Sequence, residues 1–482
     1  MNILNKYKVE IILAAVIVAF IAVFSHLAIE RYKNLWSHYY DLGIMNQVVF
    51  NTSRGWWLEM TNQDFQRNLS RFAIHFDPLM AIFAPIYLFY PSPSILLVGQ
   101  VIFVGFGAVG VYLLALNLTK EKLASLFFAV IYLWYFPVQR AILFDFHSVV
   151  LATPLLIFAV YFSLTRRYSL ALLCIVTSLL AKEHVGLVTA LLGLYLVFFK
   201  KEYQFGTIVT VLSLLFFFTT FFYIIPDTRQ AEHFALRYIK NEGGIKNVST
   251  LFAKDRFEYL SMLLLPEIVL AIFSPIPLLL ASPELGINLL SSNGNLRSFF
   301  FHYNSLIVVF VFWAMIAGYV QMKKNIKAIW LQRTIVGVFI LLFIHQIYLF
   351  GPLPDGLVRY PQSPFPKISK EKDEAIQYWQ GQLKDPLTPV AATPRLAPFF
   401  TNRRYYYDFL YDPKLDSMTR GSDDIINDLG KYQKAQYVVI NKEEIPLDRP
   451  TSTVNGYYRH LINNPGYRKI YDQAEIEVYK KN

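Results

Sequence analysis

The chain has 482 residues, of which 55% are hydrophobic, 17% aromatic and only 16% charged, with a mean hydropathy of +0.37. Ordinary soluble domains carry about 25% charged residues, so this composition excludes a purely soluble protein. The net charge of +11 does not indicate nucleic-acid binding, because much of it lies in short loops beside hydrophobic segments, where membrane topology explains it. The single cysteine, Cys174, excludes an intramolecular disulfide.

Apolar segments long enough to cross a bilayer recur along most of the chain. A span needs roughly 20 apolar residues, and shorter spans are tolerated inside bundles. The first segment, Val9–Leu27, follows a basic start and has no small-residue cleavage site after it, which predicts an uncleaved helix rather than a signal peptide. We expect about eleven spans, near residues 9–28, 94–117, 122–138, 148–164, 168–182, 184–199, 205–225, 258–273, 276–291, 303–321 and 328–350.

Prolines complicate two of the apolar segments. Phe76–Tyr90 contains Pro78 and Pro85, and counting it as a span would reverse the charge pattern of the loops that follow. We therefore expect a re-entrant or interfacial helix there. The stretch Leu264–Leu290 is interrupted at Ser274–Pro277, which predicts a tight hairpin of two spans.

Charges are sorted between the two ends of these segments. One set of ends carries basic residues: Lys6, Lys8, Lys120, Lys122, Arg166, Arg167, Lys200, Lys201, Lys323, Lys324, Lys327 and Arg333. The other set carries acids and histidines: Asp41, His75, Asp77, Asp145, His147, Glu183 and His184. Cytoplasmic loops are enriched in Lys and Arg, so the N-terminus is expected inside and the acidic ends outside. Ionisable groups beside a bilayer are costly and commonly functional, which predicts a membrane enzyme with an external catalytic face.

Three polar regions are expected outside the membrane. The first external loop covers residues 29–75, and the loop 226–257 reads as short helices or a lid. A proline-rich linker after residue 350 marks a boundary between a membrane domain, 1–350, and an extracytoplasmic α/β domain, 351–482. In that domain we expect strands at 390–392, 405–407 and 437–440, a helix at 423–432 and a terminal hairpin at 467–479. The predicted fold class is thus a polytopic α-helical membrane protein with a small C-terminal α/β domain.

Asp41 is a first candidate for catalysis. It lies a few residues beyond the first span, where a carboxylate suits a general base acting on a hydroxyl, or a ligand of a divalent cation that neutralises phosphate. The structural alternative is a helix N-cap, because an apolar run follows it.

Two Asp/His pairs are spaced by one residue, His75 with Asp77 and Asp145 with His147. In extended backbone such side chains point the same way, so each pair is able to present two ligands together. Asp77 precedes Pro78 and is also a candidate helix start. For the second pair the functional interpretation is favoured, because it lies between two hydrophobic spans.

Lys182, Glu183 and His184 form a turn between two apolar segments. Lys182 suits a phosphate, and Glu183 suits a metal or a structural ion pair with Lys182. Downstream, Glu284 is a weaker candidate that falls inside a predicted span, where it would face the interior of the bundle. Arg297 and His302 flank the next span as weaker substrate-binding candidates, and they would equally serve as headgroup anchors. The chain has no Walker A, GxSxG, HExxH or paired CxxC motif, so ATP-driven transport by this chain alone and zincin chemistry have no support.

These residues occur in stretches that resemble the GT-C superfamily of membrane glycosyltransferases. More closely, they resemble a family of predicted bacterial and archaeal membrane proteins of unknown function. The stretches are YDLGIMNQVVFNT (Tyr40–Thr52), HFDPLMAIFAPIY (His75–Tyr87), LFDFHSVVLATPLL (Leu143–Leu156), LLAKEHVGL (Leu179–Leu187), SPELGINLLSS (Ser282–Ser292), FHY (Phe301–Tyr303) and TPRLAPFFTNRRYYYDF (Thr393–Phe409).

The resemblance implies a polyprenyl-phosphate-linked sugar donor and a catalytic acid in the first external loop, which carries onto Asp41. It also implies an integral protein of a bacterial or archaeal plasma membrane. The family pattern has acids where Asn46 and His184 stand here, so a metal would be bound differently or not at all. The expected function is sugar transfer from that donor to an extracytoplasmic acceptor, whether glycan, lipid or protein.

In this hypothesis Asp41 is the base, and Lys182 stabilises the departing phosphate with His147 or Arg297. A metal, or the groups that stabilise the phosphate, would be held by Asp145, His75 and Glu183. Further substrate-binding candidates are Asp77, His184 and His302, together with His75 and Arg297. Mg²⁺ or Mn²⁺ is a candidate cofactor, with Asp41, His75, Asp145 and His147 as candidate ligands. The alternatives are a transporter or lipid flippase, which would show inverted repeats, and a non-catalytic scaffold in envelope assembly.

Overall fold

The computed structural model describes residues 7–62, 67–233, 235–236, 253–291, 293–354, 365–409, 431–446 and 453–482. The chain divides into two compact units. The helical unit comprises residues 1–28, 98–223 and 236–364, and the α/β unit comprises residues 29–97, 224–235 and 365–482. The predicted first external loop and the predicted C-terminal domain therefore fall within the same compact unit, although the sequence separates them widely.

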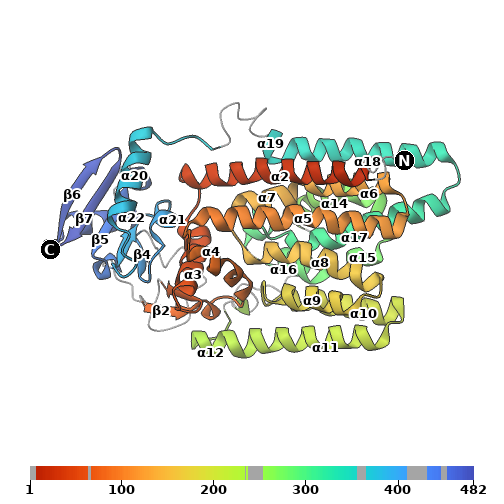
Figure 1. The fold of residues 1–482 in the computed structure, drawn as a ribbon, viewed down its shortest axis with the longest axis horizontal. Coiled ribbons are helices and arrows are strands. Elements are labelled where there is room, and N and C mark those ends of the chain that lie inside the picture. Colours follow the sequence, from red (N-terminus) through yellow and green to blue (C-terminus); the bar gives the residue numbers. More distant parts are fainter. Residues whose placement is uncertain are drawn as a thin grey trace. The chain divides into compact units, whose positions relative to one another are not determined.

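The helical unit is a bundle of hydrophobic helices (Figure 1). Two of them, α2 (Lys8–Lys33) and α5 (Pro93–Thr119), pass from one unit into the other. The others are α6 (Lys122–Trp134), α7 (Phe136–Phe144), α8 (Ser148–Leu164), α9 (Tyr168–Leu179), α10 (Val185–Lys200), α11 (Tyr203–Thr219), α14 (Lys254–Ala271), α15 (Ile276–Leu279), α16 (Ser282–Leu290), α17 (Ser305–Asn325), α18 (Ile329–Phe350) and α19 (Pro352–Pro354). The 3-10 turn η6 (Gly294–Arg297) precedes α17.

Five helices in the described part of the chain are long and apolar enough to cross a membrane: α2, α5, α11 with its continuation to Arg229, α17 and α18. The number rises to six if α6 and α7, bent by 42° about Tyr135, form one broken span. Every predicted span coincides with at least one helix. However, α16 has nine residues and reaches only about 14 Å, so it is too short to cross a bilayer alone. The count of eleven spans remains a prediction.

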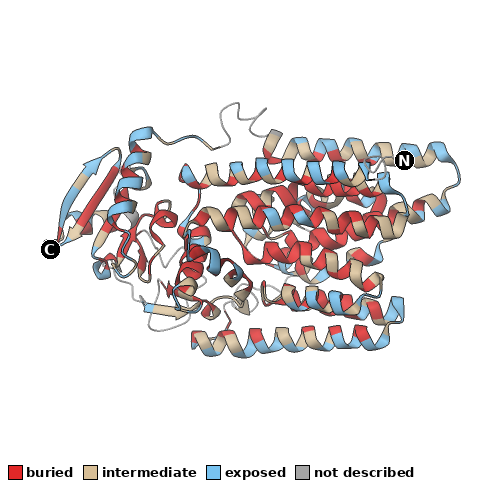
Figure 2. Ribbon diagram, in the orientation of Figure 1, coloured by how far each residue is buried: buried red, intermediate tan, exposed pale blue. Residues whose placement is uncertain are grey.

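Burial distinguishes a central helix from peripheral ones (Figure 2). In the most apolar stretch of α17, 78% of residues are buried, against 22% in α11 and 17% in α18. The peripheral helices expose large apolar side chains, such as Leu215 at 61% and Leu341 at 69%. An apolar core surrounded by an apolar surface is the arrangement expected of a bundle immersed in lipid.

Glycines allow the closest helix contacts in the bundle. A Cβ on Gly193 of α10 would lie 2.6 Å from the backbone nitrogen of Thr210 on α11. A Cβ on Gly318 of α17 would lie 2.0 Å from the carbonyl oxygen of Leu270 on α14. Small residues at such positions let helix backbones approach each other, which is a main source of packing energy between helices in lipid.

The helices alternate in direction, so the sorted charges gather at opposite ends of the bundle (Figure 1). At the basic end, Lys122 lies 2.6 Å from Glu10, Lys323 lies 2.5 Å from Glu121, and Arg166 lies 2.9 Å from Glu202. The connections that carry Asp145, His147, Glu183 and His184 lie at the other end, here called the acidic end.

The α/β unit combines loop elements from the first quarter of the chain with a C-terminal sheet. The early elements are the π-helical turn η1 (Tyr39–Gly43), α3 (Ile44–Ser53), β1 (Glu59–Asn62), β2 (Arg67–Ser70), η2 (Arg71–Ala73), η3 (Pro78–Phe83) and α4 (Ala84–Tyr87). The π-helical turn η4 (Thr220–Ile224) leads into α12 (Ile225–Arg229). The late elements are α20 (Lys370–Gln382), β3 (Val390–Ala392), α21 (Ala397–Phe400), β4 (Tyr406–Asp408), η8 (Lys431–Lys434), β5 (Tyr437–Asn441), η9 (Lys442–Glu444), α22 (Thr453–Ile462), β6 (Tyr467–Gln473) and β7 (Ile476–Lys481).

The C-terminal sheet has five strands in the order β4-β3-β5-β7-β6. The strands β4, β3 and β5 are parallel, and β7 pairs antiparallel with both β5 and β6. The predicted strands and terminal hairpin are thus confirmed, whereas α20 and α22 were not predicted. Most of the predicted helix at 423–432 and most of the predicted lid at 226–257 lie outside the described residues.

The segment 76–90 forms only the short helices η3 and α4, which together are too short to cross a bilayer. It exposes a run of large apolar side chains: Ile82 at 43%, Ile86 at 46%, Leu88 at 50%, Phe89 at 89% and Tyr90 at 61%. Short helices with an exposed apolar face are typical of membrane interfaces, so the structure is consistent with the predicted interfacial helix.

Candidate functional site

Asp41 lies within the π-helical turn η1 of the α/β unit and is partly exposed. Single π-helical turns are rare and are frequently found at functional sites, because the extra residue changes the direction of the side chains. Charged groups surround this turn. Partial desolvation and the positive charge of Arg395 lower the pKa of the surface residue His38, while the nearby carboxylate of Asp41 acts in the opposite direction.

Aromatic rings flank the same turn. Trp36 and Tyr40 are 37% and 41% exposed, and the guanidinium of Arg395 lies 5.6 Å from the centre of the Trp36 ring. Exposed rings pack well against the apolar faces of sugars, and arginine suits a phosphate. A carboxylate, a guanidinium and two exposed aromatic rings thus occur together around η1.

A network of amide and hydroxyl groups holds the segment that follows Asp41. The side chain of Asn46 donates from Nδ2 to Thr401 Oγ1 at 2.9 Å and to Asn402 Oδ1 at 2.8 Å, and accepts from the Tyr87 hydroxyl at 2.8 Å. Gln47 donates to Thr61 Oγ1 at 2.9 Å and accepts from the Thr61 backbone N–H at 3.2 Å.

The ring of Tyr39, inside η1, stacks on Tyr406 of β4 at 5.0 Å, and its hydroxyl donates to the carbonyl of Thr61. The segment 401–406 of the C-terminal sheet therefore fixes both sides of the turn that carries Asp41. The structure gives Asn46 a set of neutral partners.

His75 and Asp77 also lie in the α/β unit, but Asp77 has a structural partner. Arg71 donates to it through Nε at 3.2 Å and through Nη2 at 3.0 Å, and both side chains are about 95% buried. Such a buried bidentate pair fixes the backbone that enters η3. His75, which is partly buried, donates its backbone N–H to the carbonyl of Arg71.

In the helical unit, Asp145 and His147 occupy the ordered break between α7 and α8. They are 1% and 8% exposed. Gln100 of α5, which is fully buried, fixes this break through both ends of its amide: Nε2 donates to the Asp145 carbonyl at 2.8 Å, and Oε1 accepts from the His147 N–H at 2.8 Å. One side chain thus satisfies two backbone groups that the helix ends leave unpaired.

The structure brings His147 and His302 together at the acidic end. Their rings stack with centroids 3.6 Å apart, and the Phe144 ring lies 5.4 Å beyond His147. Two residues after His302, Asn304 accepts from the Tyr259 hydroxyl at 2.7 Å, and Tyr259 in turn accepts from Asn288 at 2.9 Å. No local sequence pattern predicts this contact between residues 155 positions apart.

Arg297 continues this chain of hydrogen bonds. Its Nη1 donates to the carbonyls of Asn288 and Ser291 at 3.0 and 2.6 Å, and its Nε lies 3.0 Å from Asp255. Three predicted residues, His147, His302 and Arg297, therefore belong to one connected polar region of the helical unit.

Lys182, Glu183 and His184 form the turn between α9 and α10, as predicted. Glu183 is 3% exposed, and Lys182 is partly buried. His184 Nε2 lies 3.2 Å from Glu284 Oε2 of α16, which is itself buried. Glu284 is thus buried within the bundle, and its partner is a residue of the predicted turn.

Among the described residues, no three His, Cys, Asp or Glu side chains are grouped so that they could hold a metal ion. The four predicted ligands are divided between the units, with Asp41 and His75 in one and Asp145 and His147 in the other.

Two buried polar residues of the helical unit, Glu267 and Gln346, were not among the residues predicted from the sequence. Glu267 of α14 is 1% exposed within an apolar helix, and Gln346 of α18 donates to its Oε2 at 3.4 Å. The signal was present in the sequence, since Pro266-Glu267 interrupts an otherwise apolar stretch. Ionisable residues within membrane helices are candidates for function by default.

Comparison with solved structures shows the fold. The chain is similar to ArnT from Cupriavidus metallidurans bound to undecaprenyl phosphate, with 13% sequence identity and a TM-score of 0.53 over 96% of this chain and 97% of that one. It also matches the apo state of the same protein, with 13% identity and a TM-score of 0.48 over 97% and 98% of the two chains. The likeness to the first structure confirms the fold resemblance to the GT-C superfamily inferred from the sequence.

A comparison with curated proteins gave no match. A family model for predicted membrane proteins, DUF2079, matches residues 31–478, which include the polar residues of both units described above. The match covers nearly all of the chain and confirms the family resemblance recognised from its short sequence stretches. The chain belongs to the DUF2079 family of predicted membrane proteins.

Proposed function

We propose that this protein is a membrane glycosyltransferase that moves a sugar from a polyprenyl-phosphate-linked donor to a hydroxyl acceptor outside the cytoplasm. The observation that carries the proposal is Asp41: a partly exposed carboxylate on a π-helical turn, beside a guanidinium and two exposed aromatic rings. The fold supports it, because the similar ArnT structure contains undecaprenyl phosphate. A lipid-linked donor needs no nucleotide-binding motif, and the chain has none.

In the proposed reaction Asp41 accepts the proton of the acceptor hydroxyl. The hydroxyl oxygen then forms a bond to the anomeric carbon of the sugar, the bond from that carbon to the phosphate oxygen breaks, and the configuration inverts. The polyprenyl phosphate leaves with the bonding electron pair. General-base catalysis of this kind contributes about 10²–10⁴-fold to a rate.

Negative charge grows on the leaving phosphate during this step, so cationic donors near it are required. Lys182 and Arg297 of the helical unit are the proposed donors. The stacked pair of His147 and His302 shapes the same polar region, and Gln100 keeps its backbone rigid.

The proposal is tested with Asp41→Asn in purified protein, using a panel of polyprenyl-phosphate sugars and quantifying transfer to extracted envelope glycans and lipids. We expect the substitution to lower turnover by at least about 10²-fold while donor binding changes little, because the amide keeps the shape of the side chain and lacks its basicity. Asp227→Asn, which changes an exposed carboxylate of the same unit, is the matched control. Equal turnover in both variants would remove Asp41 from the mechanism.

Transport of a lipid-linked substrate is the second candidate. The buried carboxyl groups of Glu183 and Glu267 favour it, because transporters place such groups in the membrane for coupling. Proteoliposomes with a fluorescent lipid-linked sugar in one leaflet separate the two functions. Movement between leaflets without sugar transfer would establish transport and exclude the glycosyltransferase.

A further inference from the structure

Glu267 is a buried carboxyl group in the apolar part of α14, and the proposed sugar transfer gives it no role. The residue is 1% exposed and lies within the run Leu263–Ala271, where every other residue is apolar. In the described part of the chain no cation lies close enough to compensate a charge on it. A carboxylate buried without a cation is costly, so a group in this position commonly takes up a proton.

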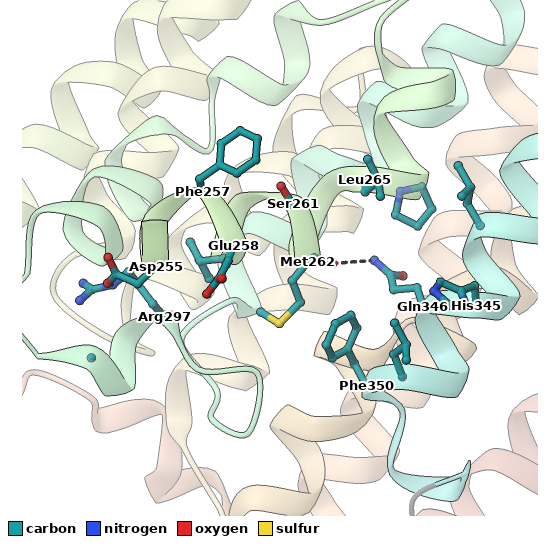
Figure 3. Close-up of a pocket in the computed structure, with 15 residues that line it drawn as sticks. Asp255, Phe257, Glu258, Ser261, Met262, Leu265, Arg297, His345, Gln346 and Phe350 are labelled. Carbon is teal, nitrogen blue, oxygen red and sulfur yellow. Dashed lines mark hydrogen bonds and ion pairs between the residues drawn. The ribbon is translucent and has the colours of Figure 1, made fainter. Parts of the chain in front are cut away.

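Gln346 of α18 is the side chain that contacts Glu267. It is 3% exposed, and its Nε2 donates to Glu267 Oε2 at 3.4 Å and to the Met262 carbonyl at 2.9 Å, the latter drawn as a dashed line in Figure 3. Among the described residues, neither Glu267 Oε1 nor Gln346 Oε1 has a hydrogen-bond partner. Two buried acceptor oxygens on adjoining side chains thus lack a donor, which a proton on the carboxyl group would supply.

The backbone around Glu267 leaves little room for a metal ion. Pro266 has no N–H, so the Met262 carbonyl has no partner within the helix and accepts from Gln346 instead. The next carbonyl, that of Leu263, accepts from the Tyr135 hydroxyl at 2.7 Å. Cations such as Ca²⁺ take about six or more oxygen ligands, whereas the two side chains offer two unpartnered oxygens. The site therefore suits a proton, which needs only one donor and one acceptor.

A cavity of about 760 Å³ lies between α14 and α18 and reaches Gln346 (Figure 3). Asp255, Glu258 and Ser261 line it at intervals of three residues along α14, and this spacing places them on one face of the helix. His345 and Gln346 line it from α18. The volume is ample for several water molecules, and these polar groups offer them hydrogen bonds. The cavity thus provides a polar path along α14 to the partner of Glu267.

The path begins at the acidic end of the bundle. Tyr259 of α14 bonds to Asn304, which lies two residues after His302 at that end. The side chains of Asp255 and Glu258 are 50% and 62% exposed, so this end of the cavity is accessible to water. From Asp255 to Pro266 the helix rises roughly 16 Å, at about 1.5 Å per residue. Protons are therefore able to reach Gln346 from solvent without crossing the whole bundle.

The other titratable groups near Glu267 come from three helices and one helix break. Tyr135 lies between α6 and α7, Tyr259 lies on α14 itself, and His345 lies on α18. On α17, Tyr319 packs against Phe128. The three phenols hold their protons at neutral pH, and a histidine passes protons on readily there. None of these groups competes with the carboxyl group as the place where a proton is stored.

We propose that Glu267 is a proton-binding site of the helical unit, filled from the acidic end through the cavity between α14 and α18. A proton from water near Asp255 and Glu258 joins Glu267 Oε1, and the resulting O–H donates to Gln346 Oε1. When the proton leaves, the carboxylate draws the Gln346 amide away from the Met262 carbonyl, so α14 is held less firmly at Pro266. This inference goes beyond the proposed function and does not depend on Asp41.

The test is infrared difference spectroscopy of the full-length protein in phosphatidylcholine nanodiscs. A protonated carboxyl group has a C=O band that an ionised one lacks. We expect such a band at neutral pH in the unmodified protein and its loss in Glu267→Gln, which keeps the size of the side chain. Glu258→Gln is the matched control and should keep the band, because an exposed carboxyl group is ionised at this pH. Absence of a band that depends on Glu267 would overturn the proposal.

The hydrogen bond to Gln346 is tested separately. Gln346→Leu removes the acceptor of the Glu267 O–H, so the C=O band should move to higher frequency. Gln332→Leu is the matched control on the same helix, because Gln332 also donates to a backbone carbonyl, that of Ile326, at 2.7 Å. An unchanged frequency in Gln346→Leu would exclude the pairing. Loss of the band on addition of sodium at constant pH would overturn the proposal, because a metal ion would then occupy the site.

The route of the proton is tested by transfer into D₂O, which shifts the band as the carboxyl proton exchanges. Ser261→Trp should slow this exchange by at least about tenfold, because the indole occupies the space that water needs in the cavity. Leu341→Trp should exchange at the rate of the unmodified protein, because Leu341 is 69% exposed on α18 and does not line the cavity. Equal exchange rates in the two variants would exclude the cavity as the route.

Discussion

The two compact units bury their polar groups in different ways. In the helical unit, side chains mostly bond to backbone groups that prolines and helix ends leave open, as Gln100 does at the break after α7 and Gln346 does below Pro266. The α/β unit adds a network in which side chains also bond to one another, and Asn46 alone contacts Thr401, Asn402 and Tyr87.

The difference follows from the surroundings of each unit. In lipid no water is present to satisfy an open carbonyl, so each interruption of a helix needs a protein donor. In the α/β unit, segments far apart in sequence must be held in register, and amides and hydroxyls with fixed geometry provide specific contacts for this. The helical unit therefore depends on close backbone packing, and the α/β unit depends on a connected polar network.

The largest expected effect tests the close packing of the helical unit. Gly318→Ala places a Cβ 2.0 Å from the carbonyl oxygen of Leu270, so α14 and α17 must separate. We expect a loss of about 3 kcal/mol, at the upper end for overpacked sites. Thermal unfolding in detergent measures it. Gly337→Ala in α18 is the control, since no atom lies within 4 Å of its added Cβ. Equal stability of the two variants would mean that glycine contacts do not hold the bundle.

A slightly smaller effect is expected in the polar network of the α/β unit. Asn46→Leu removes the partner of the Tyr87 hydroxyl and of the buried Thr401, and since each such loss costs at least about 1 kcal/mol, we expect a total of about 2 kcal/mol. Limited proteolysis should then cut near residues 54–57 or 404–405 faster, while helices of the other unit stay protected. Thr52→Ser, which keeps the hydroxyl that accepts from Leu58 N–H, is the control in the same helix. Cleavage spread equally over both units would show that the network is not specific to this unit.

The smallest expected effect is a change in how the stability of the α/β unit depends on pH, and it arises from the buried phenol of Tyr406. Burial raises the pKa of Tyr406 well above its ordinary value of 10.0. The unfolded chain thus loses this proton before the folded one, so the contribution of Tyr406 to stability is intact below pH 10 and is lost progressively above it. Above pH 10 the free energy of unfolding should therefore fall less steeply in Tyr406→Phe, by up to about 1.4 kcal/mol per pH unit. Denaturant unfolding between pH 8 and about 11 measures the slope, and Tyr378→Phe, 56% exposed, should leave it unchanged.

Sequence reasoning was most successful where the signal is local. The length of the hydrophobic segments predicted the spans, and the structure has a helix at each of them. The residue pattern predicted strands at 390–392 and 437–440, where the structure has β3 and β5. It failed where partners come from distant segments. Nothing in the sequence joins His147 to His302, or Asn46 to Thr401, because stacking and hydrogen bonding across 155 or 355 positions leave no local pattern.

The sequence by itself determined that this is a polytopic membrane protein with charges sorted between its helix ends, because hydropathy and charge act residue by residue. The GT-C-like fold was inferred only from the resemblance of its short sequence stretches to known families. Only the tertiary structure decided which polar groups meet. It packs the turn of Asp41 against the C-terminal strands. It also pairs Asp77 with Arg71 and His184 with Glu284, and it forms the cavity between α14 and α18. These outcomes depend on which buried groups find partners in three dimensions, and a buried polar group without one costs free energy wherever its partner lies in the sequence.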